Sequence, residues 1–284
     1  MADLTVELAL KRDRLLQLLR SFGSCAVAFS GGLDSTVLAK AAQLALGQNA
    51  VAVTGTSASL AVGELDEARE LARQIGVRHE VIETNELSIP EYQANAGDRC
   101  YHCKTELFTQ VRQIAGRLGV AVVCDGSNRD DHGEYRPGLQ AVRERDVRSP
   151  LAECALTKPE IRQLAEFWGL PTWDKPATPC LSSRIAYGQQ VTPERLAMID
   201  RAEQFLWERG FRPLRVRYHA GDVARIEVPA EQLPTFADPQ FCREVVDYLK
   251  SVGFKYVAVD LEGFRSGSMN AVLPVESLGK NSGG

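Results

Sequence analysis

Short runs of consecutive apolar residues alternate with segments of helical periodicity between residues 24 and 168. The apolar runs occupy 25–29, 50–54, 79–82 and 120–125, and the helical segments that follow them end near 46, 75, 118 and 168. Strands that form unbroken apolar runs are typical of a parallel sheet whose two faces are both covered by helices. Crossovers between parallel strands are right-handed, which winds the helices onto the sheet. The sequence therefore predicts an α/β fold with a doubly wound parallel sheet.

This pattern ends between residues 171 and 190, where PTWDKPATPCLSSRIAYGQQ contains three prolines and has no period. Beyond it we expect helices over 193–209 and 241–252 and strands over 214–219, 223–228 and 256–259. A chain of 284 residues is long enough for two domains. We therefore predict a first domain at 1–185, a smaller α+β domain for substrate binding or oligomerisation at 186–276, and a disordered tail at 277–284.

Composition indicates a soluble protein with a hydrophobic core, since 44% of the residues are hydrophobic and 25% are charged. The net charge of −4 argues against a general nucleic-acid binder. The first 20 residues mix acids and bases with apolar positions and predict an amphipathic helix, not a signal peptide or a membrane span. Seven cysteines without an export signal indicate reduced thiols. We expect a cytoplasmic protein with neither nucleic acid nor membrane as a partner.

The motif SGGLDST lies between the first predicted strand and the helix that follows it. Gly31 and Gly32 allow the backbone to approach a phosphate and permit positive φ, and the first amides of the helix favour an anion. Ser30 and Ser35 add hydroxyl donors, and Asp34 offers an oxygen ligand for Mg²⁺. The motif lacks the lysine of a Walker loop. It resembles the SGGxDS loop of the N-type ATP pyrophosphatases, although a plain glycine turn is the alternative.

Two further polar residues follow strands, where ligand sites of such sheets lie. Thr54 ends the second strand and Asp125 ends the fourth, in the sequence CDGSN. We expect both to contact ATP, and Asp125 to contact nucleotide or magnesium, unless it caps the next turn. Adenylation explains such a site, because a carboxylate oxygen leaves readily only after it becomes part of AMP. The sequence thus predicts an ATP-dependent enzyme that activates a carboxylate.

Three cysteines form a second set of candidate functional residues. Cys100 and Cys103 lie at the start of a predicted helix in DRCYHCK, and their spacing places both thiols on one face. Cys180 lies in TPCLSSR. Three thiolates match a 4Fe–4S cluster with one open iron. Structural zinc with a fourth ligand, a redox pair and simple packing are the alternatives. Neighbouring cations are expected to lower the pKa values of these thiols: Arg99, Lys104 and Arg184.

A pair of arginines, Arg215 and Arg217, lies two residues apart in a predicted strand and therefore faces one side. Guanidinium groups in such an arrangement suit a phosphate or carboxylate ligand. Arg265, in GFRSGSMN, could close the same pocket. The alternative is internal ion pairing with acidic residues of the chain: Glu203, Glu227 or Asp260.

Taken together, SGGLDST, CDGSNRDDHGEYRPG, CLSSRIAYG, RVRYH and GFRSGSMN resemble the motifs of the LarE family of ATP-dependent sulfur transferases. The resemblance covers nearly the whole chain and places residues 1–185 in the PP-loop ATP pyrophosphatase superfamily. It implies adenylation of a carboxylate of a pyridinium dicarboxylate mononucleotide, and conversion of that group to a thiocarboxylate for the nickel-pincer cofactor of lactate racemase. One group of the family sacrifices a cysteine as the sulfur source, whereas another uses three cysteines that hold a 4Fe–4S cluster.

This chain resembles the three-cysteine group, which implies ATP, Mg²⁺ and a 4Fe–4S cluster as cofactors. By this resemblance Cys100, Cys103 and Cys180 hold the cluster. The implied reaction centre includes Ser183 and Arg184. Residues Ser30 to Ser35 bind ATP. The substrate contacts are Arg215, Arg217, Arg265 and Glu203, the last also near magnesium. The family also implies homo-oligomers, hexamers among them, and partner proteins that supply sulfide or insert nickel.

Three other functions remain open from the sequence alone. A PP-loop tRNA thiolase would need a basic surface for RNA, which the acidic balance does not favour. An ammonia-dependent amide synthetase would use the same loop with structural or zinc-binding cysteines. A nucleotide sensor would bind ATP without releasing AMP.

Overall fold

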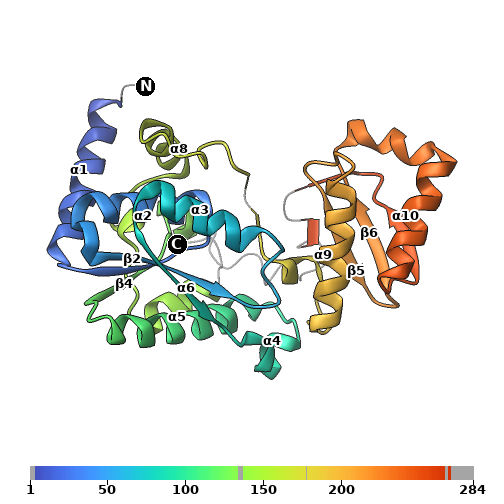
Figure 1. The fold of residues 1–284 in the computed structure, drawn as a ribbon, viewed down its shortest axis with the longest axis horizontal. Coiled ribbons are helices and arrows are strands. Elements are labelled where there is room, and N and C mark those ends of the chain that lie inside the picture. Colours follow the sequence, from blue (N-terminus) through green and yellow to red (C-terminus); the bar gives the residue numbers. More distant parts are fainter. Residues whose placement is uncertain (1–3, 134–136, 177, 266–267, 270–284) are drawn as a thin grey trace, which may run out of the picture.

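Four parallel strands form the central sheet of the computed structural model, which describes residues 4–133, 137–176, 178–265 and 268–269. The strand order is β3-β2-β1-β4 (Figure 1). The bounds are Cys25–Ala28 for β1, Ala50–Thr56 for β2, Arg78–Glu83 for β3 and Val122–Cys124 for β4. The predicted α/β fold is confirmed. The fourth strand is shorter than expected, because only three of its residues pair with β1.

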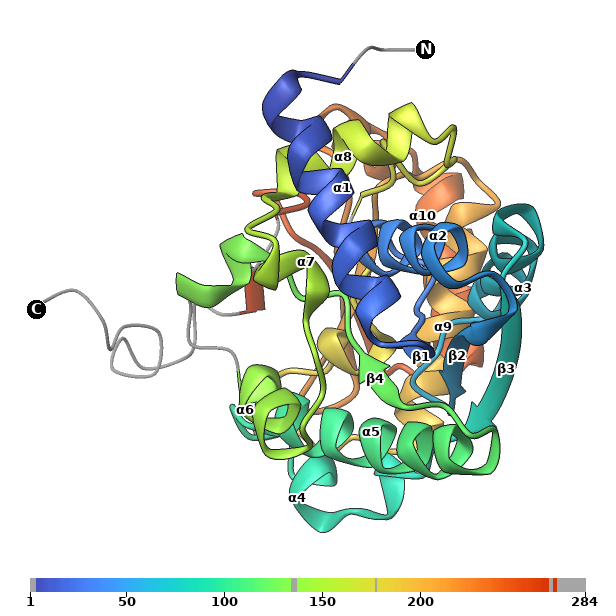
Figure 2. The same cartoon turned by 90° about the vertical axis from the view of Figure 1, so that its left-hand side faces the viewer.

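Helices cover both faces of this sheet (Figure 2). On one face lie α1 (Val6–Ser21), α2 (Leu33–Leu46), α3 (Glu64–Ile75) and α8 (Lys158–Phe167). On the other lie α5 (Arg99–Arg117) and α6 (Pro137–Glu144). Successive strand residues point to opposite faces, so Cys25 and Val27 join the first core while Ala26 joins the second. Both faces are therefore apolar, as the continuous apolar runs predict.

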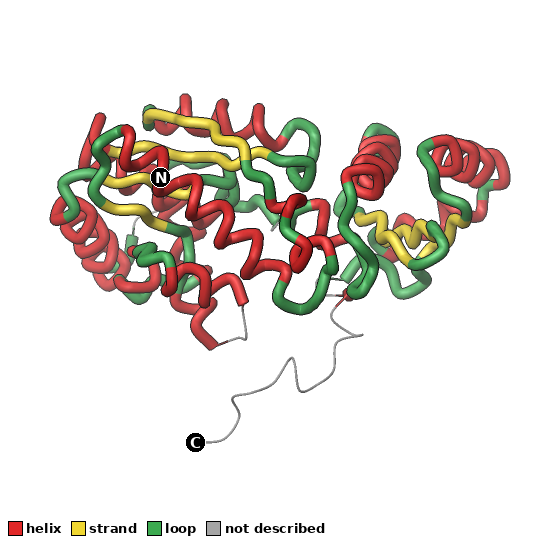
Figure 3. The backbone as a smooth tube through the Cα atoms, turned by 90° about the horizontal axis from the view of Figure 1, so that it is seen from below, coloured by secondary structure: helices red, strands yellow, loops and turns green. Residues whose placement is uncertain are grey.

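A second sheet of three strands has its own core and lies beside the first (Figures 1 and 3). Strand β5 (Arg215–His219) is antiparallel to β6 (Val223–Glu227), and β7 (Tyr256–Val259) is parallel to β6. Helices α9 (Pro193–Trp207) and α10 (Pro239–Ser251) pack on it, with a 3-10 segment at Ala230–Ala237. This core also takes in Leu181, Ile185 and Tyr92.

The remaining elements are short, and one of them, a 3-10 turn, carries the candidate residues Ser183 and Arg184. Helices α4 (Pro90–Gln93) and α7 (Pro150–Glu153) and the 3-10 turn Leu181–Arg184 have four residues each. Helix α5 begins at Arg99, six residues before its apolar period starts, so Cys100 and Cys103 lie within its first two turns. None of the described helices combines the length and apolar character needed to cross a membrane. The predicted tail lies outside the described residues.

Candidate functional site

The SGGLDST loop joins β1 to α2 at the carboxyl edge of the sheet. Gly31 has a φ of 67°, a left-handed conformation that favours glycine, whereas Gly32 has a φ of −81° and is the N-cap of α2. Of the two glycines, only Gly31 therefore adopts a positive φ. The Ser35 hydroxyl accepts a hydrogen bond from Ser30 N at 3.3 Å and donates to Gly32 O at 3.1 Å. These bonds fix the loop next to helix amides that an anion can use.

Thr54 braces the loop from the neighbouring strand. Its buried hydroxyl donates to the carbonyl of Phe29 at 2.7 Å and lies 2.8 Å from Nε2 of His79. A hydroxyl has one proton, so Nε2 of His79 must donate to Thr54. Burial lowers the pKa of His79, which favours the neutral ring with its proton on Nε2. Thr54, the predicted ATP contact, therefore donates its hydroxyl proton to Phe29, the residue that precedes the SGGLDST loop.

Asp125 lies buried where β4 ends and has two roles in the structure. Its carboxylate accepts hydrogen bonds from the backbone and hydroxyl of Ser127 and from the hydroxyl of Ser149. The backbone bond is the turn cap that the sequence left as an alternative. One oxygen also lies 3.6 Å from Nζ of Lys104. Next to Asp125, a Cβ on Gly126 would lie 3.0 Å from Ser35 N, so glycine allows this turn to pack on the phosphate loop.

Asp34, the predicted magnesium ligand, lies on the first turn of α2. It forms an ion pair with Lys158 and accepts a hydrogen bond from Asn128 Nδ2 at 3.3 Å. Lys158 is the first residue of α8, and nothing in its local sequence marks it as part of a nucleotide site. A carboxylate in this position can serve magnesium as an oxygen ligand, in competition with the ammonium group of Lys158.

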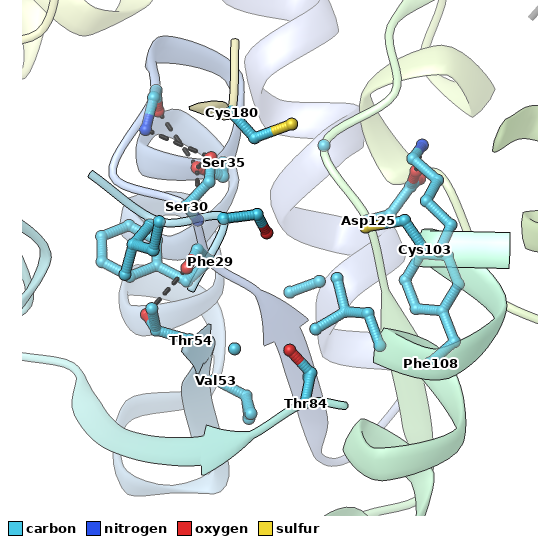
Figure 4. Close-up of a pocket in the computed structure, with 18 of the residues that line it drawn as sticks. Phe29, Ser30, Ser35, Val53, Thr54, Thr84, Cys103, Phe108, Asp125 and Cys180 are labelled. Atoms are coloured by element: carbon cyan, nitrogen blue, oxygen red, sulfur yellow. Dashed lines mark hydrogen bonds and ion pairs between the residues drawn. The ribbon is translucent and has the colours of Figure 1, made fainter. Parts of the chain in front are cut away.

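These residues surround a cavity of about 480 Å³ at the carboxyl ends of the central strands (Figure 4). Cys103, from α5, and Cys180, from the loop before the 3-10 turn Leu181–Arg184, line the same cavity. The predicted residues on its wall are Ser30, Gly32, Asp34, Ser35, Thr54, Asp125, Cys103 and Cys180. The phosphate loop and two of the three thiols therefore share one space.

The three cysteines are electrostatic neighbours. A negative charge on Cys180 raises the pKa of both Cys100 and Cys103. Burial is the larger cause and raises the pKa of both thiols further, although Cys100 as a residue retains exposure to solvent. Arg99 and Lys104 do lower the pKa of Cys100, but desolvation exceeds their effect. For Cys100 and Cys103 the predicted lowering of the thiol pKa was therefore wrong in direction, because local sequence does not report burial.

A buried polar network joins the two cysteine segments. The hydroxyls of Tyr92 and Ser182 lie 2.6 Å apart, and Arg99 donates to Ser182 O at 2.9 Å and to the side-chain oxygen of Asn95. The Asn95 amide donates, at 2.9–3.2 Å, to the carbonyls of Ile185, Ala186 and Gln189. The chain itself therefore holds the Cys180 segment against the start of α5.

Arg184 holds the same segment from the side of the second sheet. Its buried guanidinium forms two 3.1 Å contacts with Glu203 and donates to Cys180 O at 2.9 Å and to Ser183 Oγ at 3.1 Å. Glu203 also accepts a hydrogen bond from Val216 N at 2.9 Å. The structure thus places Ser183, Arg184 and Glu203 behind Cys180, outside the cavity wall.

The paired arginines of β5 lie on the second sheet. Arg217 forms an ion pair of 2.8 Å with fully buried Glu227 and contacts Ser183 O at 3.3 Å. The alternative of internal ion pairing therefore holds for Arg217. Arg215 lies 5.4 Å over the ring of Phe264, and burial, followed by the charge of Arg184, lowers the pKa of Arg215 to about 10. The lowered pKa reflects desolvation first and the nearby positive charge of Arg184 second.

Arg265 lies at the edge of this cluster and is half exposed. It pairs with Glu262 and lies 3.8 Å from Asp260. Arg225, which the sequence reasoning missed, forms ion pairs with both Asp260 and Glu227. The linked cluster contains five guanidiniums and four carboxylates: Arg184, Arg215, Arg217, Arg225 and Arg265 with Glu203, Glu227, Asp260 and Glu262. Residues 266–267 and 270 of the GFRSGSMN motif lie outside the described residues.

Across the described ranges, no three His, Cys, Asp or Glu side chains are arranged closely enough to hold a metal ion. The three thiols are therefore neighbours without being at ligand distances. As a donor set they nevertheless fit an iron–sulfur cluster, because sulfur is its usual ligand and all three act on one another beside the Arg99 cation.

Comparison with known proteins gives consistent matches. A family model described as asparagine synthase matches residues 11–115. An uncharacterized protein of Synechocystis sp. is 47% identical over 263 residues, which cover 93% of this chain and 98% of that protein. Pyridinium-3,5-bisthiocarboxylic acid mononucleotide synthase of Lactiplantibacillus plantarum is 39% identical over 272 residues, which cover 95% of this chain and 98% of that protein. The tRNA-specific 2-thiouridylase of Beijerinckia indica is 28% identical over 188 residues, and the match covers 43% of its length.

Proposed function

The chain belongs to the LarE family of ATP-dependent sulfur transferases, which includes pyridinium-3,5-bisthiocarboxylic acid mononucleotide synthase, and on that premise we propose its reaction in detail. It adenylates a carboxylate of a pyridinium dicarboxylate mononucleotide, with release of pyrophosphate, and then converts the activated group to a thiocarboxylate. Nickel-pincer cofactor biosynthesis uses this product. The observation that carries the proposal is the shared cavity, whose wall contains both the phosphate loop and the thiols of Cys103 and Cys180.

The phosphate loop performs the first step by position and charge. Helix amides and the hydroxyls of Ser30 and Ser35 receive the β- and γ-phosphates, and Asp34 holds Mg²⁺. Lys104, on the cavity wall, offsets negative charge at the α-phosphate. The substrate carboxylate attacks the α-phosphorus, the bond to pyrophosphate breaks, and an acyl-adenylate forms. Attack is favoured because both reactants are held in one space.

The cysteines serve the second step. Bound to Cys100, Cys103 and Cys180, a 4Fe–4S cluster would supply sulfide to the activated carbonyl carbon, with AMP as the leaving group. The protein contributes the clamp around that donor: Arg99, at the start of α5, and Asn95, just before it, hold the Cys180 segment, and Arg184 joins that segment to Glu203 of α9. The cysteines themselves survive the reaction, in contrast with relatives that sacrifice one.

The arginine cluster provides the anchor for the mononucleotide. Guanidiniums suit the 5′-phosphate, and the proposed contacts are Arg215, Arg217 and Arg265. Glu203 acts on the substrate through Arg184, because its carboxylate is already bound to that guanidinium and to Val216 N. The proposal includes a cytoplasmic homo-oligomer that receives sulfide from a partner protein.

Serine variants of the cysteines test whether the loop performs adenylation and the cysteines serve sulfur transfer alone. In Cys100→Ser, Cys103→Ser and Cys180→Ser proteins, AMP and pyrophosphate formation should persist while thiocarboxylate formation is lost. Anaerobically reconstituted wild-type protein should be brown, with iron–sulfur absorbance, and each variant should lose that absorbance. Cys242→Ser is the matched control, because this half-buried thiol donates to Phe236 O far from the cavity. Thiocarboxylate formation by all three variants would exclude the proposed sulfur donor.

A further inference from the structure

Glu86 is a buried carboxylate on the cavity wall that the proposed reaction does not yet use. It begins the 3-10 turn Glu86–Ser88 after β3, and it is 2% exposed. One of its oxygens accepts hydrogen bonds from the hydroxyls of Ser57 and Ser59, the latter at 2.6 Å. These two serines follow β2 and also line the cavity. Together they hold the carboxylate in one orientation.

Glu86 differs in its charge balance from Asp34 and Asp125, two other carboxylates of this cavity. Asp34 has Lys158 as an ion-pair partner, and Asp125 has Lys104. Within the described ranges, no lysine, arginine or histidine forms an ion pair with Glu86, whose hydrogen-bond partners are the two neutral hydroxyls. Burying an ionised carboxylate without a cation is costly, and hydroxyl donors offset only part of that cost. The missing positive charge is therefore to be sought in a ligand of the cavity.

The position of Glu86 relative to the sulfur donors narrows the choice of ligand. Glu86 lines the same cavity as Cys103 and Cys180. The carboxylate is thus near the sulfur end of the cavity. A buried negative charge in that place, without a cation, is unfavourable by itself. It becomes favourable when the group that enters the cavity to be sulfurated is itself a cation.

We propose that Glu86 is a specificity-determining residue that recognises the positive charge of the substrate's pyridinium ring, with Ser57 and Ser59 holding its carboxylate in place. The inference rests on the proposed function. A ring nitrogen that carries a ribosyl group has no N–H to donate, so a protein can recognise its charge only through an anion or an aromatic face. A ring next to Glu86 also presents its carboxyl substituents to Cys103 and Cys180, which line the same space.

A pair of substrates tests the proposal. One is the pyridinium dicarboxylate mononucleotide, and the other is its neutral isostere, in which carbon replaces the ring nitrogen. Wild-type protein should form AMP from the cationic ring with a higher kcat/KM. Glu86→Gln should reduce that preference by about 10- to 100-fold and leave kcat/KM for the neutral ring unchanged, because close charges near a protein surface are worth a few powers of ten at most. Glutamine keeps an acceptor for both serines.

The controls separate ring recognition from folding and from the proposed function. Glu91→Gln, on the exposed face of α4, should change neither kcat/KM value, and Glu86→Gln should keep the wild-type affinity for ATP. Glu86→Asp keeps the charge and should retain most of the preference. Equal losses with both substrates, or the same loss of preference in the aspartate variant, would overturn the role of Glu86 alone. No AMP formation by wild-type protein with the cationic ring would overturn the proposed function as well.

Discussion

Asn95 provides the strictest test of the clamp between the cysteine segments. Its side chain is fully buried, its amide donates to three carbonyls of residues 185–189, and its oxygen accepts from Arg99. The backbone has a φ of 54°, which asparagine tolerates and glycine adopts freely. Asn95→Gly therefore removes the hydrogen bonds without adding strain.

The expected loss follows from the bonds that disappear. The two amide protons cannot fully satisfy three carbonyls, so about two net hydrogen bonds to carbonyls and one to a buried cation are lost. At about 1 kcal/mol for each bond, with a further penalty for groups left unpaired, the free energy of unfolding should fall by about 3 kcal/mol. Asn95→Ala should add about 1 kcal/mol of left-handed strain.

Urea unfolding of cluster-free protein, with reductant and chelator present, measures this change. Arsenite, which binds up to three thiols, reports separately on whether the cysteines still converge, and its affinity should fall in Asn95→Gly. Asn85→Gly, at an exposed position, controls for the flexibility that glycine adds to the unfolded chain. A loss below about 1 kcal/mol together with unchanged arsenite affinity would refute the clamp.

Further predictions concern the loop, the arginine cluster and pH. Gly31→Ala should weaken ATP binding about tenfold in calorimetry through strain at φ 67°, whereas Gly47→Ala, with a φ of 56° away from the cavity, should leave ATP affinity unchanged. Arg217→Met leaves buried Glu227 with Arg225 as its remaining cation, so unfolding should become easier by about 3 kcal/mol in urea. The pKa of His79 is lowered in the folded state from 6.5, so the folded protein binds fewer protons and stability should fall as pH drops below 6.5. Urea unfolding measured at several pH values should show that the free energy of unfolding depends less on pH in His79→Gln than in the wild-type protein. The same pH dependence in both proteins would exclude His79 as its cause.

The sequence predicted those features that depend on residues close together along the chain. The unbroken apolar runs identified the parallel strands, because both faces of this sheet are buried. SGGLDST identified the phosphate loop, since its glycines and serines act within one turn. The spacing of Cys100 and Cys103 placed them together at a helix start, although α5 begins at Arg99, where no apolar period exists to mark it.

Features that depend on tertiary burial were not predictable. The pKa direction of the thiols was wrong because nearby cations are visible in sequence and desolvation is not. Glu86 belongs to no motif, and only the fold brings it to Ser57 and Ser59. For Arg217 the sequence offered Glu227 as one of three partners, and the antiparallel pairing of β5 with β6 brings the two strands together.

The central claim is that one cavity joins ATP cleavage to sulfur donation by cysteines that are not consumed. Anaerobic incubation of reconstituted protein with ATP, sulfide and the pyridinium dicarboxylate mononucleotide, followed by mass spectrometry of both small molecule and protein, tests it most directly. The account predicts that sulfur replaces oxygen in the mononucleotide over repeated turnovers while the protein mass stays constant. A protein that loses the mass of hydrogen sulfide from Cys180 after one turnover, or AMP formation without sulfur incorporation, would contradict it.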